Sequence, residues 1–157
     1  SIACNTTMAK LDKVSHNGIL NVAEENKAAQ QYIDIMQTKT PSIHQQAGNL
    51  SGGNQQKVLL SKWMFAEPDI LILDEPTRGI DVGAKYEIYC IMNQMVAQGK
   101  AVVMISSELP ELLGMCDRIY VMNEGKMVAE FTSKEATQEK IMSAILSSDN
   151  KKGAQKA

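Results

Sequence analysis

A short apolar run at residues 69–73, with the sequence DILIL, limits the folds open to this chain more than any other segment. Runs of this kind are typical of strands buried in a parallel sheet. A parallel neighbour has to be reached through a long crossover, usually a helix. Residues 81–98 have the pattern of that helix, with Asp81 as its N-cap and Gly99 as its stop, and the apolar run at 101–105 supplies the second strand. The segment therefore predicts an α/β fold with a parallel core.

The residues before this strand are predicted to be mostly helical. Residues 1–23 are polar and read as irregular, whereas a helical apolar period begins at Glu24 and ends near Lys39, ahead of Pro41. A second helix is expected over residues 52–65. Its inward side chains are expected to be Val58, Leu59, Trp63 and Met64.

The residues after the second strand predict a hairpin and a final helix. Residues 118–122 form a third apolar run, and a turn at 123–125 leads into a hairpin partner at 126–131. Thr137 is expected to cap the last helix.

These elements divide the chain into three predicted parts. Residues 1–66 form a helical subdomain, residues 67–147 form a mostly parallel α/β core, and residues 148–157 form a disordered tail.

The composition of the chain indicates which partners and which cellular compartment to expect. The 157 residues carry a net charge of −2, and no basic face stands out, so no nucleic-acid partner is expected. The cysteines Cys4, Cys90 and Cys116 form no CxxC pair and there are 2 histidines, which argues against a zinc site and for a reduced, cytosolic protein. No segment is apolar enough to span a bilayer. The chain begins without Met, as if within a longer sequence, so a fragment is expected.

Two short motifs could carry chemistry. The first is the turn Leu50-Ser51-Gly52-Gly53 at a helix start, where Ser51 could cap the helix and backbone N–H groups could bind an anion. A serine-capped helix with no ligand would account for the same residues. The second is the pair Asp74-Glu75 at the carboxyl end of a strand, where open α/β sheets bind ligands. Two solvated acids at a strand exit would account for that pair equally well.

Taken together, the motifs resemble those of the ATP-binding cassette (ABC) ATPases in order and spacing. In that family the LSGG turn at residues 50–53 is the signature motif, residues 70–77 are Walker B, and residues 78–81 close the D-loop. Asn54 followed by Gln-Gln-Lys resembles the ATPase subunits of monosaccharide importers of the ribose, galactose and xylose type. Those subunits carry two cassettes in one chain. The sequence SSELPELLGMCDRIYVMNEG at 106–125 resembles the second cassette, within the group most of all that of the multiple-monosaccharide importers.

The resemblance implies a partial P-loop NTPase fold, because the Walker A strand and loop normally precede the point where this chain begins. Asp74 is expected to hold Mg²⁺ through water, and Glu75 to polarise the water that attacks ATP. Ser107 stands at the position of the family's switch histidine, and a serine cannot carry the charge of an imidazolium. The ATP of a facing cassette is expected to contact Ser51, Gly52, Gly53, Asn54, Gln55 and Asp81.

Two functions from different classes follow from the resemblance. In the first, the chain is the C-terminal part of the second nucleotide-binding domain of an ATPase subunit that powers monosaccharide import with ATP and Mg²⁺. Its partners would be the rest of that subunit or its first cassette, the membrane permease subunits and, indirectly, a sugar-binding protein, and it would lie in the cytoplasm on the inner face of the membrane. The chain alone is expected to lack ATPase activity.

The alternative is a stand-alone, non-catalytic interaction module that keeps the dimer face of the cassette. DNA-repair ATPases share the motifs, but they insert long heptad-rich coiled coils that this sequence lacks.

Without the Walker A strand, the strand at 69–73 would have an open neighbour in the sheet. The chain is therefore predicted either to be marginally stable or to cover this edge by oligomerising or rearranging.

Overall fold

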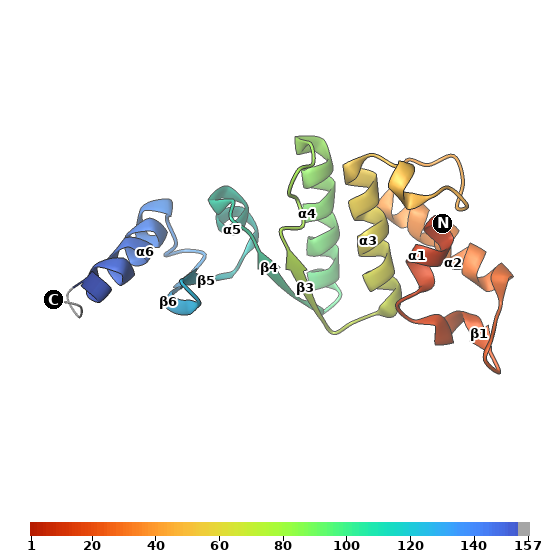
Figure 1. The fold of residues 1–157 in the computed structure, drawn as a ribbon, viewed down its shortest axis with the longest axis horizontal. Coiled ribbons are helices and arrows are strands. Elements are labelled where there is room, and N and C mark those ends of the chain that lie inside the picture. Colours follow the sequence, from red (N-terminus) through yellow and green to blue (C-terminus); the bar gives the residue numbers. More distant parts are fainter. Residues whose placement is uncertain (154–157) are drawn as a thin grey trace. The chain divides into compact units, whose positions relative to one another are not determined.

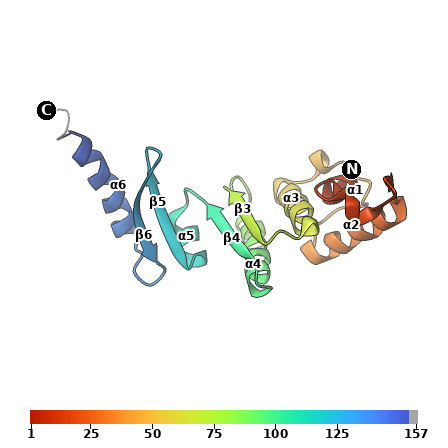
Figure 2. The same ribbon diagram turned by 90° about the horizontal axis from the view of Figure 1, so that it is seen from below.

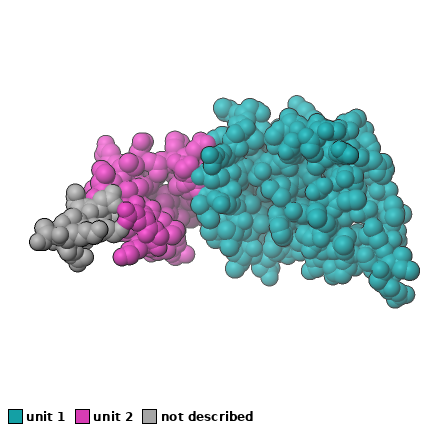
Figure 3. All heavy atoms as spheres, viewed as in Figure 1, with its two compact units in different colours: residues 1–105 teal, residues 106–157 magenta. Residues whose placement is uncertain are grey.

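The computed structural model describes the backbone of residues 1–153 and the side chains of residues 1–147. The chain divides into two compact units, one covering Ser1–Ile105 and the other beginning at Ser106 (Figure 3). The predicted boundary at residue 66 falls inside the first unit and stays a prediction. Within the described residues, no helix combines the length and apolar character needed to cross a membrane.

The first unit begins with a helical region rather than the irregular segment predicted for residues 1–23. Helix α1 (Ile2–Thr7) is capped by the Ser1 side chain, and its Ile2 and Ala3 are buried. A short 3₁₀ helix η1 (Leu11–Val14) and a two-stranded hairpin of β1 (Ser15–His16) and β2 (Ile19–Leu20) follow. The prediction missed α1 because its small and polar residues, such as Thr6 and Thr7, are buried by packing against distant helices.

Helix α2 (Val22–Met36) confirms the predicted helix but has different ends. The Asn21 side chain accepts hydrogen bonds from the N–H groups of Ala23 and Glu24, so the helix begins before Glu24. It ends at Gln37, which adopts a left-handed conformation with a φ of 49°. Pro41 therefore does not end the helix.

Helix α3 (Gly52–Ala66) follows the 3₁₀ helix η2 (Ala47–Asn49) and lies where it was predicted, but its inward face is rotated. Leu59 and Trp63 are 41% and 42% exposed, so the prediction that both face the core is wrong. Leu60 and Phe65 are buried in their place, because α3 packs against α1 and α2 on one side and α4 on another.

The parallel pair of β3 (Ile70–Asp74) and β4 (Ala101–Ile105) confirms the predicted parallel core. The crossover is helix α4 (Val82–Ala97), which covers one face of the pair (Figures 1 and 2). Leu71 and Leu73 are buried on that face, but Ile70 and Ile72 on the other are 62% and 65% exposed. The prediction of fully buried strands is therefore wrong for one face, since no described element of the first unit covers it.

The second unit contains the predicted hairpin. Strand β5 (Arg118–Asn123) pairs antiparallel with β6 (Lys126–Thr132) through a turn at Glu124-Gly125 in which both residues have a positive φ. Helices α5 (Leu109–Met115) and α6 (Gln138–Gly153) complete the unit. Its core is formed by Ile119, Val121 and Ile141.

Two predictions concern the end of the chain. Thr137 accepts a hydrogen bond from the Lys140 N–H, which confirms the predicted cap of the last helix. Helix α6 continues past residue 148, where the disordered tail was predicted to begin, and residues 154–157 of that predicted tail lie outside the described residues.

Candidate functional site

The signature turn, residues 50–53, forms the entrance to α3, and its serine does not cap the helix in the predicted way. Ser51 occupies the N-cap position, but its side chain accepts no hydrogen bond from the helix N–H groups. Its Oγ instead accepts a hydrogen bond from Asn54 Nδ2 at 2.9 Å. Because Oγ acts as an acceptor there, its own proton is left to donate to another group, such as an oxyanion.

The two glycines of the signature turn have different surroundings. A methyl group added at Gly53 would lie 2.8 Å from Cβ of Ala84, so the backbone of α3 approaches the first turn of α4 too closely for a side chain. A methyl group added at Gly52 would meet nothing closer than Ile80 Cγ2, at 3.7 Å. Gly53 is thus required by helix packing, whereas Gly52 is exposed. The amino-terminal ends of α3 and α4 lie side by side (Figure 1).

Asn54 and Gln55, both predicted to contact nucleotide, use their side-chain amides to hold the chain around the turn. Asn54 Oδ1 accepts a hydrogen bond from the Lys39 N–H at 2.9 Å, which ties the turn to the segment after α2. Gln55 Nε2 donates to the Leu50 carbonyl at 2.8 Å and to the Gly48 carbonyl at 3.3 Å. These bonds order the backbone on both sides of Ser51. A direct contact of either amide with nucleotide stays a prediction.

Asp81 is the N-cap of α4, as predicted. Its Oδ1 accepts a hydrogen bond from the Ala84 N–H at 3.0 Å, and the residue is exposed. Ile80, in the segment from Arg78 to Asp81, lies against Gly52 of the signature turn. Ala84, in the first turn of the helix that Asp81 caps, lies against Gly53. The structure brings the signature and the predicted D-loop together within one unit.

The acidic pair lies at the carboxyl end of β3, beside the last residue of β4. Asp74 is exposed and is paired in register with Ile105. Glu75 is half-buried, and its N–H donates to the Ile105 carbonyl at 2.8 Å. Its φ is 47°, a left-handed conformation that costs a non-glycine residue on the order of 1 kcal/mol or more and that helix ends and turns of this chain also use, as at Gln37 and Glu124. Nothing in the sequence indicated this conformation.

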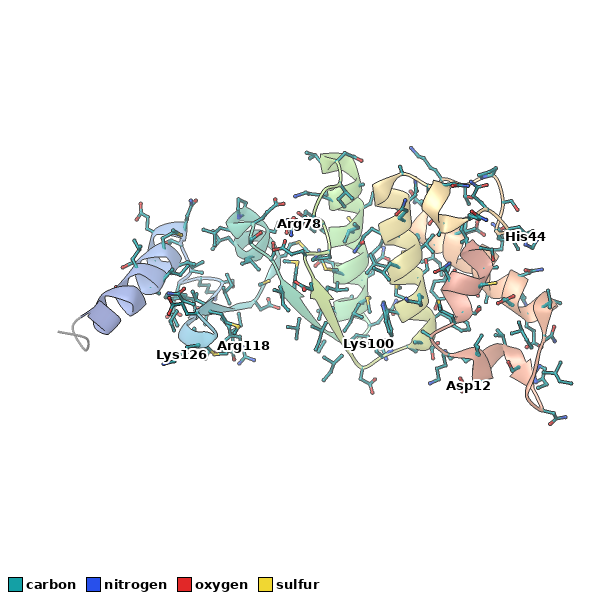
Figure 4. The ribbon with its side chains drawn as sticks, in the orientation of Figure 1. Asp12, His44, Arg78, Lys100, Arg118 and Lys126 are labelled. Carbon is teal, nitrogen blue, oxygen red and sulfur yellow. The ribbon has the colours of Figure 1, made fainter. Side chains whose placement is uncertain are left out.

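The loop after Glu75 turns the chain back toward α4. The Arg78 N–H donates to the Glu75 carbonyl at 3.2 Å, and Gly79 has a φ of 74°. Figure 4 shows Arg78 at the carboxyl end of the parallel pair and Lys100 at the opposite end, just before β4. The candidate residues of the first unit therefore gather at the edge where α/β sheets bind ligands.

Ser107, the predicted counterpart of the switch histidine, is exposed and belongs to the second unit. Its neighbour Ser106 donates from Oγ to Glu111 Oε2 at 2.8 Å, and Glu111 is buried on α5. Sequence reasoning did not single out Ser106 or Glu111. Their pairing ties Ser106 to α5 within the second unit.

No cluster of three or more His, Cys, Asp or Glu side chains that could hold a metal ion occurs in the part of the chain that the structure describes. The donor available for Mg²⁺ in the first unit is the exposed carboxylate of Asp74. Mg²⁺ keeps several waters and is commonly held by one or two carboxylates together with substrate phosphates. This donor fits that mode of binding, with ATP phosphates as the other ligands.

Comparison with known proteins gives the same family as the motifs. Residues 3–78 match the family model described as ABC transporter. The L-arabinose transport ATP-binding protein of Geobacillus stearothermophilus is 56% identical over 150 residues, which are 96% of this chain and 29% of the relative. A xylose import ATP-binding protein of Moorella thermoacetica is 57% identical over 141 residues, 90% of this chain and 28% of the relative. The chain thus spans less than a third of the length of these relatives.

Solved structures show the same fold. The ATP-binding cassette MJ1267 of an ABC transporter matches with a TM-score of 0.73 at 20% identity, covering 92% of this chain and 62% of the cassette. The cassette MJ0796, solved in a post-hydrolysis state bound to ADP and Pi, matches with a TM-score of 0.66 at 22% identity, covering 75% of this chain and 51% of the cassette. The fold is that of part of an ABC ATPase cassette. The motifs, the fold and the relatives thus agree with the ABC transporter domain that residues 3–78 match.

Proposed function

We propose that this chain provides the signature and Walker B parts of a cassette in the ATP-binding subunit of a monosaccharide importer. The observation that carries the proposal is the exposed signature turn, which is fixed against the first turn of α4 by the contact between Gly53 and Ala84. The sugar-import part of the proposal is supported by relatives at 48–57% identity that are named as arabinose, xylose, ribose or galactose transport proteins.

The signature turn has the groups that a phosphate of a facing cassette's ATP requires. Ser51 has a hydroxyl proton left to donate, and the exposed Gly52 places no side chain over the start of α3. Backbone N–H groups at a helix start favour negative charge. We therefore assign Ser51, Gly52 and Gly53 to contact with the γ-phosphate, with Asn54, Gln55 and Asp81 supporting the turn.

The acidic pair serves the second, separate nucleotide, which the same cassette binds. Asp74 would hold Mg²⁺ through water, and Glu75 would polarise the attacking water. Mg²⁺ supplies neutralisation of the charge that develops on the phosphates during transfer. The left-handed backbone of Glu75 and its hydrogen bond to Ile105 fix the direction in which this carboxylate leaves the strand. Ser107 offers only a neutral hydroxyl at the switch position, so hydrolysis at this nucleotide is slow.

The chain works with other parts of the transporter. A phosphate-binding loop with its lysine supplies most of the affinity of such proteins for nucleotide, and this sequence contains none. The rest of the subunit or its first cassette provides that loop. Permease subunits and, through them, a sugar-binding protein are the further partners, and the assembly lies on the cytoplasmic face of the membrane. Alone, the chain does not hydrolyse ATP.

A chimera tests this function directly. The matching segment of the Geobacillus stearothermophilus arabinose protein is replaced by this chain, giving the arabinose chimera, which is co-expressed with the permease and binding protein of that transporter. We expect ATP hydrolysis and arabinose uptake. The matched control is Ser51→Ala in the chimera, which removes the hydroxyl assigned to the facing cassette's ATP and should keep assembly but lose about tenfold or more of the ATPase rate.

Two results would contradict the proposal. One is an assembled chimera without ATPase activity. The other is binding of Mg-ATP by the chain alone with a Kd of about 1 μM, corresponding to about 8 kcal/mol of binding energy, which the partial site lacks the groups to supply.

A non-catalytic interaction module is the second candidate, because the signature turn and the Asp81 segment are already assembled within this chain. Such a module would bind a complete cassette carrying ATP without supporting hydrolysis. An uptake-negative chimera, together with ATP-dependent binding of the chain to an isolated cassette, would favour this candidate over the first.

A further inference from the structure

Lys57 is a buried lysine that none of the assigned roles uses. It lies on α3, one turn after Gly53, and it is 3% exposed. Its Nζ lies 2.5 Å from Glu87 Oε2 and donates to the Gln37 carbonyl at 3.2 Å. A buried ammonium is strongly destabilising unless it is paired and hydrogen-bonded. The structure therefore gives Lys57 specific partners on two other segments.

Each of the two partners lies near a contact with the start of α3: Lys39, two residues after Gln37, donates to Asn54, and Ala84, on the helix of Glu87, contacts Gly53. Gln37 is the left-handed residue that ends α2, so its carbonyl belongs to the negative end of that helix. Glu87 lies on α4, the helix that Asp81 caps. Lys57 therefore connects the signature helix to α2 and to α4 at once.

The contacts along α3 and α4 follow helical spacing. Gly53 and Lys57 are four residues apart on α3, and Ala84 and Glu87 are three apart on α4, so each pair lies on one face of its helix. Gly53 contacts Ala84, and one turn further on Lys57 pairs with Glu87. The two contacts thus form one continuous seam that begins at the signature turn and at Asp81.

We propose that Lys57 is a positioning residue that holds the signature turn and the Asp81 segment together as one unit. Its long side chain reaches the Gln37 carbonyl and the Glu87 carboxylate at the same time. An apolar side chain of the same length would fill the volume but would leave α3 and α4 joined only by packing. For catalysis the inference rests on the proposed function, since the signature turn is there assigned to ATP and Asp81 to the support of that turn.

Hydrogen exchange of the full chain tests the structural half of the inference. In Lys57→Met we expect the amides of residues 79–84 to exchange about tenfold faster, while those of α1 keep their rates. Lys57→Arg should stay within about twofold of the wild type, because it keeps the charge. The matched control is Lys62→Met, which removes a lysine from the same helix without touching the seam.

The inference is overturned if residues 79–84 exchange at the wild-type rate in Lys57→Met, or if all amides accelerate together, since that would indicate a general loss of stability. Should Lys57→Met fail to fold, Glu87→Gln takes its place in the exchange experiment. The Glu87 side chain is 46% exposed, and the amide of the substituted glutamine keeps an acceptor for Lys57. In that variant the amides of residues 79–84 should exchange about threefold faster, and unchanged exchange rates there would likewise overturn the inference.

The arabinose chimera tests the catalytic half. Lys57→Met should lower kcat by about tenfold with the KM for ATP changed by less than about twofold, because the signature contact forms chiefly in the reactive state. Lys57→Arg should restore kcat. An unchanged kcat in Lys57→Met would overturn the catalytic half. If the unmodified chimera is itself inactive, the proposed function fails, and the exchange experiment still decides the role of Lys57.

Discussion

Gly52 and Gly53 are adjacent in sequence, yet the structure separates their roles. Gly53 is buried at the point where α3 and α4 cross, and Cβ of Ala84 occupies the space that a side chain would need. Gly52 faces solvent, and its φ is not in the left-handed region. The first glycine is therefore available for a ligand, while the second serves the fold.

This difference predicts opposite outcomes for two matched substitutions. Gly53→Ala should destabilise the first unit by about 1–3 kcal/mol through overpacking. Gly52→Ala should leave the free energy of unfolding within about 0.5–1 kcal/mol of the wild type, because alanine is favoured over glycine in a helix. Trp63, the single tryptophan of the chain, lies on α3 and reports urea unfolding by its fluorescence.

A second substitution, opposite Gly53, tests whether overpacking causes the loss of stability. Ala84→Gly removes the opposing methyl group, so the double variant Gly53→Ala with Ala84→Gly should recover part of the lost stability. Equal losses of stability in Gly52→Ala and Gly53→Ala would contradict the assignment of Gly53 to packing.

Lys13 contacts residues at the carboxyl end of α3. Its Nζ donates to the Phe65 carbonyl at 2.9 Å and lies 2.7 Å from Glu67 Oε2. The hydrogen bond and the charge of Lys13 hold the pKa of Glu67 below its ordinary value of 4.5. A carboxyl group whose folded pKa is lowered stabilises the protein above its unfolded pKa and loses that effect as the pH falls through the folded pKa.

The stabilising effect of Glu67 should therefore be present at neutral pH and lost toward acid pH. Glu67→Gln should reduce the free energy of unfolding at pH 7 by no more than about 0.5 kcal/mol, because the glutamate is exposed to solvent. The difference from the wild type should shrink once the pH falls below 4.5 and vanish below the folded pKa. Urea titrations followed by Trp63 fluorescence at a series of pH values measure this. A difference that grows toward acid would refute the ion pair as its cause.

At the level of elements, the sequence predicted what depends on local patterns. Periodicity located α3 and α4, the parallel pair and the β5–β6 hairpin, and capping residues such as Asp81 and Thr137 lie where they were expected. Helix α1 was missed, because its helical character comes from packing of small residues against distant helices. Leu59 and Trp63 were assigned to the wrong face for a similar reason, since α3 is contacted from two sides.

Strands β3 and β4 present an apolar row on the face opposite α4. Its members are 48–65% exposed: Ile70, Ile72, Val103 and Ile105. Exposed apolar strands with an unpaired edge favour association with another chain.

Matched substitutions on the two faces of β3 test this row. Ile72→Thr should keep the stability within about 0.5 kcal/mol, because threonine is β-branched and the position is exposed, and it should reduce self-association in sedimentation velocity. Leu71→Thr on the covered face should cost about 2 kcal/mol or more. Equal self-association of Ile72→Thr and the wild type would exclude this face as its cause.

At the level of the whole molecule, the proposed function assigns the candidate residues to two different nucleotides. The motifs predicted the exposed Ser51, Asp74 and Asp81 correctly as positions at element ends, because turns and caps have local signals. The contacts that fix these residues, between Gly53 and Ala84 and between Lys57 and Glu87, join segments about 30 residues apart. No local pattern encodes such pairs, so sequence reasoning did not find them.

The uncovered face of β3 and β4 also bears on how long this chain survives in a cell. Chaperones and proteases act on polypeptides that are not fully folded, and differences in stability of about 1–2 kcal/mol can change protein abundance several-fold. A polypeptide that displays Ile70, Ile72, Val103 and Ile105 in a row offers such a segment even when its helices are fully formed. Under the proposed function the rest of the subunit would cover this row, so we expect the unassembled chain to be degraded sooner than the assembled one.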